Sequence, residues 1–106
     1  MRRRRGAFDE LVSRQLALFD EDEATLLEEA DEAEEAWIRS GRDEAEESYG
    51  DFQLVVDAIA DRLLEIRDGY ASTLDDDAAE SYRLAFHAAV ARRFRRYASL
   101  VADLEP

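Results

Sequence analysis

The only proline in the chain is its last residue, Pro106, so no proline interrupts a helix before the end of the sequence. Eighteen alanines, together with many leucines, glutamates and arginines, add a strong intrinsic preference for helix. No run of β-branched residues alternates with polar residues, as a half-buried strand requires. Because 46% of the 106 residues are hydrophobic, the chain can build one core, and the sequence predicts an all-α domain.

Apolar residues recur at helical spacing in three segments, which predict helices over residues 7–40, 43–72 and 77–104. The connections between these segments are short, and short connections favour antiparallel neighbours. The sequence therefore predicts an elongated up-down-up three-helix bundle. The alternative is a first helix that is broken near residues 20–23, although its apolar stripe keeps its phase across them.

The apolar stripes also predict which side chains form the core. In the second helix the spacing alternates between four and three residues throughout, as in a heptad seam. Gly50 interrupts this helix at a cost of about 1 kcal/mol relative to alanine, either because helices approach closely there or because the cost is tolerated. The predicted core residues are Phe8, Val12, Phe19, Leu26, Trp37, Tyr49, Phe52, Val56, Ile59, Leu63, Ile66, Tyr70, Tyr82, Phe86, Val90, Tyr97 and Leu104.

Two pairs of acidic residues predict where the second and third helices begin. Asp43 with Glu46, and Asp77 with Glu80, have the spacing of a capping box. In that motif the first side chain accepts a backbone N–H, and the second reaches back. We therefore expect Asp43 and Asp77 to be N-caps.

The charges are strongly unequal. Twenty-seven acidic residues against 14 basic ones, all of them arginine, give a net charge of −13. Ten acids and no base lie between residues 20 and 35, whereas four arginines cluster between residues 92 and 96. The first and third helices of an up-down-up bundle are parallel, so these two segments would lie at similar heights and partly neutralise each other.

Arg93 lies near the middle of the apolar stripe of its helix, where an unpaired charge is costly. We expect it to pair with Glu23 or Glu34 of the first helix. In the alternative, its guanidinium reaches solvent along its alkyl stem. The candidate interaction residues are Arg92, Arg93, Arg95, Arg96, Glu23 and Glu34.

The residues present exclude several kinds of chemistry. Without cysteine there are no disulfides, no thiol catalysis and no cysteine-ligated zinc or iron–sulfur clusters. His87 is the only histidine and Leu84 stands three residues before it, so the Glu-x-x-His pairs of di-metal bundles are missing. No glycine-rich phosphate loop and no nucleophile–histidine–acid pattern occurs. We expect no catalytic residue, no metal site and no cofactor, and therefore no enzyme.

A basic arm, Arg2 to Arg5, precedes the first helix. We expect residues 1–6 to be disordered and residues 7–106 to form the single helical domain. The arm is not followed by the apolar segment of a signal peptide, and no stretch approaches the ~18 apolar residues that cross a membrane. We therefore expect a cytoplasmic protein without membrane contact. The acidic remainder of the chain would repel nucleic acid, so phosphate binding by the arm is the weaker interpretation.

These features favour a non-enzymatic interaction module, such as an adaptor, an assembly subunit or a self-associating bundle, whose partner is a protein or a second copy. The alternative is an acidic inhibitor or antitoxin-like protein whose carboxylates mimic nucleic-acid phosphates. The acidity also suits solubility in concentrated salt and the codon usage of a GC-rich genome. The apolar residues off the main stripes that a partner could contact are Leu18, Leu27, Ile38, Leu54 and Leu64.

Overall fold

The computed structural model describes residues 6–98, and within this range the chain forms helices and short connections but no strand. The all-α prediction is therefore confirmed. None of the described helices is both long enough and apolar enough to cross a membrane. The helices are α1 (Asp9–Asp22), α2 (Ala24–Arg39), α3 (Ala45–Ala71), α4 (Asp76–Arg93) and α5 (Arg95–Ala98).

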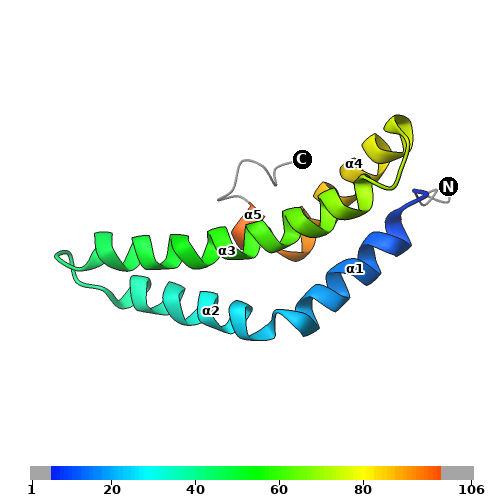
Figure 1. Cartoon of the computed structure of the whole chain (residues 1–106). Coiled ribbons are helices and arrows are strands. Elements are labelled where there is room, and N and C mark those ends of the chain that lie inside the picture. The colour runs from blue at the N-terminus through cyan, green and yellow to red at the C-terminus, as the bar shows by residue number, and fades with distance from the viewer. Residues whose placement is uncertain (1–5, 99–106) are drawn as a thin grey trace, which may run out of the picture.

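The first predicted helix is two helices, so an unbroken helix over residues 7–40 is wrong and the break falls at the alternative position. Glu23, between α1 and α2, has φ −111° and ψ 26°. Its N–H still bonds to the carbonyl of Phe19 at 2.9 Å, and its carbonyl accepts the N–H of Leu27 at 3.0 Å. Because helical hydrogen bonds continue on both sides, the chain bends here without losing the phase of its apolar stripe (Figure 1).

The bend decides which helices become neighbours. α2 packs along α3, whereas α1 packs against α4, and α4 in turn packs against α3. In Figure 1 the end of the molecule with the α2–α3 connection contains only α2 and α3 among the described helices, while α4 lies toward the other end. The five helices therefore depart from the three uninterrupted rods that the sequence predicts.

The third predicted helix is also interrupted. α4 ends at Arg93, Phe94 has φ −122° and ψ 44°, and α5 begins at Arg95. The ring of Phe94 lies edge-on to that of Phe19 of α1, with ring centres 5.4 Å apart, and Phe94 is buried. The break thus places an aromatic ring in the core. The last part of the predicted helix, residues 99–104, lies outside the described residues.

Both predicted N-caps are wrong. Glu44 is the N-cap of α3 and makes no side-chain capping bond. α4 begins with Asp75, whose carboxylate accepts the N–H of Ala78 at 2.9 Å. Three consecutive aspartates, residues 75–77, could each have capped α4. Asp75 is the one with the extended backbone that an N-cap requires, since its φ is −70° and its ψ is 170°.

The core runs through α1, α3 and α4, includes Ala30 of α2, and is closed by Phe94 and Tyr97. Of the predicted core residues, Val12, Phe19, Phe52, Val56, Ile59, Leu63, Tyr82, Phe86, Val90 and Tyr97 are buried. The half-buried ones that pack against this core are Phe8, Leu26, Trp37, Ile66 and Tyr70. Buried residues that the stripes missed are Leu16, Ala60, Ala71, Phe94 and Ala98.

Tyr49 is a correction to the predicted core, because its side chain is 37% exposed. Its ring contacts that of Trp37, with ring centres 4.9 Å apart. Trp37 lies near the end of α2 and Tyr49 near the start of α3. At this end of the molecule α2 and α3 are the only described helices, so no third described helix covers the aromatic pair (Figure 1). Leu104, also predicted for the core, lies outside the described residues.

Gly50 marks no close approach of helices. A Cβ added at this position would meet no atom within 4 Å beyond its own neighbourhood. Of the two explanations for this glycine, the structure therefore supports a tolerated cost.

Candidate interaction site

A groove with a volume of about 350 Å³ lies between α1 and α3. It exists because the bend at Glu23 directs α1 toward α4, so α1 and α3 are not packed closely against each other. We call it the α1–α3 groove. Its lining residues are Gln15, Leu18, Phe19, Asp22, Glu23, Arg62, Glu65 and Ile66.

Three of the residues that line the α1–α3 groove are apolar. Phe19 is buried at its base, Ile66 is half-buried, and Leu18 is 58% exposed. Leu18 is one of the apolar residues that the sequence placed off the main stripes. Leu27 and Leu64 instead pack against the core, while Ile38 and Leu54 are exposed away from the groove. Leu18 is therefore the off-stripe residue that lines the α1–α3 groove.

The charged residues that line the groove, which we call its rim, are Asp22, Glu23, Arg62 and Glu65, and three of these four are acidic. Arg62 of α3 lies 3.6 Å from the carboxylate of Glu23 and 3.5 Å from that of Glu65. Asp22 completes the rim and forms no ion pair with the described residues. One guanidinium thus pairs with two of the three carboxylates that line the groove. The sequence pattern missed Arg62 and Glu65, because it gave no sign that α1 and α3 would diverge around them.

A partly buried hydrogen bond joins Gln15, on the α1 side of the groove, to α4. The hydroxyl of Tyr82 on α4 donates to Oε1 of Gln15 at 2.8 Å, and Tyr82 has no exposed surface. Burial raises the pKa of the Tyr82 hydroxyl, so it remains a neutral donor. The rings of Phe8 and Tyr70 pack on that of Tyr82, at 5.7 and 4.8 Å between centres. α1 is thereby held to α4 rather than α3.

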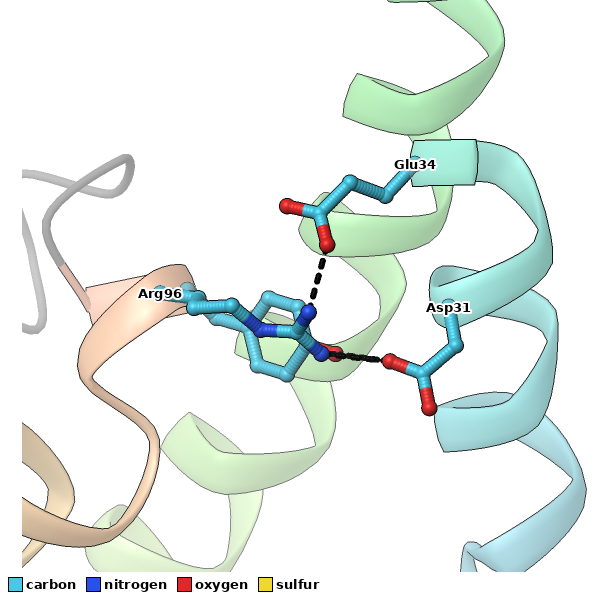
Figure 2. A network of polar contacts seen from close by, with 4 residues as sticks. Asp31, Glu34 and Arg96 are labelled. Carbon is cyan, nitrogen blue, oxygen red and sulfur yellow. Dashed lines mark hydrogen bonds and ion pairs between the residues drawn. The ribbon is translucent and has the colours of Figure 1, made fainter. Parts of the chain in front are cut away.

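Of the four clustered arginines, two form ion pairs with acids of α1 and α2, and two form none with the described residues. Nε of Arg93 donates to the carboxylate of Asp20 at 2.9 Å. Arg96 donates to both Asp31 and Glu34, as Figure 2 shows, and the nearby carboxylates, Asp31 foremost, raise its pKa. Arg92 and Arg95 are exposed and form no ion pair within residues 6–98.

The predicted partners of Arg93 are therefore wrong. Glu23 faces α3 and pairs with Arg62, and Glu34 pairs with Arg96. Arg93 is the last residue of α4, which packs on α1, and Asp20 of α1 is the acid within its reach. The prediction failed because it assumed a straight first helix, in which Glu23 would have faced the third.

The ten acids between residues 20 and 35 also separate into two groups. Four of them, Asp20, Glu23, Asp31 and Glu34, pair with arginines as described above. The others are exposed and have no ion-pair partner in the described part of the chain; they are Glu21, Asp22, Glu28, Glu29, Glu32 and Glu35.

The described residues contain no group of three or more histidine, cysteine, aspartate or glutamate side chains that could hold a metal ion. The one histidine, His87 of α4, is half-buried, and its Nε2 accepts a hydrogen bond from Nη1 of Arg67 of α3 at 2.9 Å. No protein-family model matches the chain, and neither a curated protein nor a solved structure shows significant similarity to it.

Proposed function

We propose that this protein is a non-enzymatic interaction module that binds a protein partner in the α1–α3 groove. The observation that carries the proposal is Leu18, which is 58% exposed and lines a concave surface together with Phe19 and Ile66. Exposed apolar side chains are common, but apolar side chains gathered in a groove beside charged ones match the apolar and polar parts of a protein interface.

The size of the groove fits an anchoring point rather than a whole interface. A stable interface buries about 800 Å² on each partner, and its binding energy comes mostly from a few central residues. A groove of about 350 Å³ holds one or two large side chains. The surrounding exposed surface of α1 and α3 would then form the rim of the contact.

Site-specific cross-linking tests this proposal. Because the chain contains no cysteine, an introduced cysteine is the only site that a thiol reagent labels. A photoreactive group is attached to Leu18→Cys, or to Leu54→Cys as a control on an exposed site outside the groove. We expect a discrete adduct from position 18 in lysate of the native cell, and none of the same mass from position 54. Identical adduct patterns from the two positions would contradict the proposal.

A second candidate function is an acidic inhibitor that mimics nucleic-acid phosphates. It is supported by the six exposed acids of α1 and α2 that have no ion-pair partner among residues 6–98. Contacts of this kind weaken steeply with salt, whereas apolar anchoring persists. If the position-18 adduct disappears at 500 mM NaCl and Glu28→Gln/Glu32→Gln removes it at low salt, the mimic is favoured over the groove.

A further inference from the structure

We infer that the partner segment for the α1–α3 groove is a cationic amphipathic helix, with an apolar side chain inserted between Leu18 and Ile66. This inference rests on the proposed function and adds the chemistry of the partner. It depends on three properties of the groove: the charge of its rim, its repulsion of a second copy, and its position between two helices.

The charge of the rim selects for cations. Asp22, Glu23 and Glu65 supply three carboxylates, and Arg62 is shared between two of them. Asp22 and the exposed acids that follow it on α2 have no compensating arginine in the described structure. With a net charge of −13, the whole molecule adds a long-range field that attracts a cationic segment and accelerates its association.

The same charges disfavour a second copy of this chain in the groove. A two-fold contact places each surface against itself. Asp22, Glu23 and Glu65 of one copy would then face the same carboxylates of the other, and like charges at an interface are costly. The net charge of −13 on each copy adds to that repulsion.

The position of the groove favours a helix as its occupant. The groove lies between α1 and α3, so a partner helix would occupy a place beside them, with apolar anchors on one face. Leu18 lies on the α1 side and Ile66 on the α3 side, so one large side chain of the partner would contact both. Arginine or lysine at neighbouring positions of the partner would meet Asp22 and Glu65.

Three synthetic peptides of about 15 residues test the inference against the intact protein by fluorescence anisotropy. The first carries leucine at every third or fourth position and arginine on the other face. The second keeps the leucines but has glutamine in place of arginine, and the third keeps the arginines but has serine in place of leucine. Each is titrated with wild type and with the variants Leu18→Ser, Leu54→Ser, Asp22→Asn and Glu28→Gln.

We expect the first peptide to bind most tightly. Leu18→Ser should weaken its binding about tenfold, which corresponds to about 1.4 kcal/mol, while Leu54→Ser leaves it unchanged. Asp22→Asn should weaken binding and reduce its dependence on salt, whereas Glu28→Gln, outside the groove, should change it much less.

Three outcomes would overturn the inference. If the glutamine peptide binds as tightly as the arginine peptide and Leu18→Ser still weakens both, the groove is a docking site but its partner is not cationic; the proposed function then stands. If Leu18→Ser and Leu54→Ser behave alike with every peptide, the α1–α3 groove is not the binding site, and the proposed function fails too. If sedimentation shows a dimer of the wild type that Leu18→Ser dissociates, a second copy is the occupant.

Discussion

At the scale of single residues, three side chains have roles that can be tested separately. The Tyr82 hydroxyl holds Gln15, and with it α1, against α4. Asp75 begins α4 by accepting the N–H of Ala78, and so fixes where that helix starts. Leu18 is left exposed because the divergence of α1 from α3 removes the neighbour that would have covered it. Each of these roles leads to a measurable consequence.

Asp75→Ala should destabilise the protein by about 1 kcal/mol, because it removes the side-chain acceptor at the start of α4. For a domain of this size that corresponds to a fall in melting temperature of about 4–8 °C. Asp77→Ala is the matched control, and its effect should be much smaller. Thermal unfolding followed by circular dichroism measures both. A larger loss of stability in Asp77→Ala than in Asp75→Ala would indicate that Asp77 is the N-cap, as the sequence predicted.

We expect the buried hydroxyl of Tyr82 to make the protein less stable at high pH. Its folded-state pKa is raised by burial, so the unfolded chain releases this proton at lower pH than the folded protein does. The stabilisation is fully present below the unfolded pKa of about 10 and is lost as the pH rises through the folded pKa. Urea unfolding between pH 8 and pH 11 should show a shallower decline in Tyr82→Phe than in wild type. Parallel declines would contradict the buried, neutral hydroxyl.

Tyr82→Phe also removes the hydrogen bond to Gln15, which should cost about 1 kcal/mol at neutral pH. Gln15→Ala is the complementary variant. It should lower the stability at neutral pH, because it leaves the buried Tyr82 hydroxyl without this acceptor.

At the scale of helices, the important event is the bend at Glu23. It sends α1 to α4 while α2 stays on α3, and the arginines of α4 and α5 then meet different acids on either side of it. Arg93 pairs with Asp20 before the bend, and Arg96 pairs with Asp31 and Glu34 after it. These ion pairs report on where the bend lies.

A double-mutant cycle tests this arrangement. Arg93→Ala and Asp20→Asn should show a coupling free energy of about 0.5 kcal/mol, small because both side chains are more than a third exposed. The same cycle between Arg93→Ala and Glu23→Gln should give about zero. Urea unfolding of the single and double variants supplies the numbers. Coupling to Glu23 rather than Asp20 would indicate a straight first helix.

The sequence predicted the helices well where local rules suffice. The heptad spacing from Phe52 to Leu63 marks the buried face of α3, because that face packs against neighbours along its length. The bend at Glu23 was predicted only as the alternative to an unbroken helix, since neither proline nor glycine marks it and the apolar phase continues through it. The break at Phe94 likewise depends on tertiary contact with Phe19. The groove follows from the bend, so the sequence named Leu18 only as an off-stripe residue and Glu23 only as a partner for Arg93.

At the scale of the whole molecule, the acidic charge opposes folding as well as self-association. The exposed acids of α2 include Glu28 and Glu32, one helical turn apart, with no arginine opposite them in the described structure. Repulsion among such charges destabilises the compact state and is relieved by salt.

Raising NaCl from 20 to 500 mM should therefore increase the melting temperature by several degrees, about 1 kcal/mol of stability. Glu28→Gln/Glu32→Gln should be more stable than wild type at low salt and gain less from added salt. Differential scanning calorimetry of the two proteins makes the comparison. A melting temperature that falls with salt would mean that the arginine–carboxylate pairs outweigh the repulsion.

The central claim is that α1 and α3 leave an open groove in which Leu18 is exposed, and the reactivity of a thiol at that position tests this directly. The single-cysteine variants Leu18→Cys, Leu54→Cys and Leu16→Cys are each treated with a maleimide reagent under native conditions. The exposed fractions of these leucines are 58%, 69% and 1%. Position 18 should react within a few-fold of the rate at position 54 and about 100-fold faster than position 16, which reacts only when the structure opens. If position 18 reacts as slowly as position 16, the groove is closed in solution, and this would contradict the central claim.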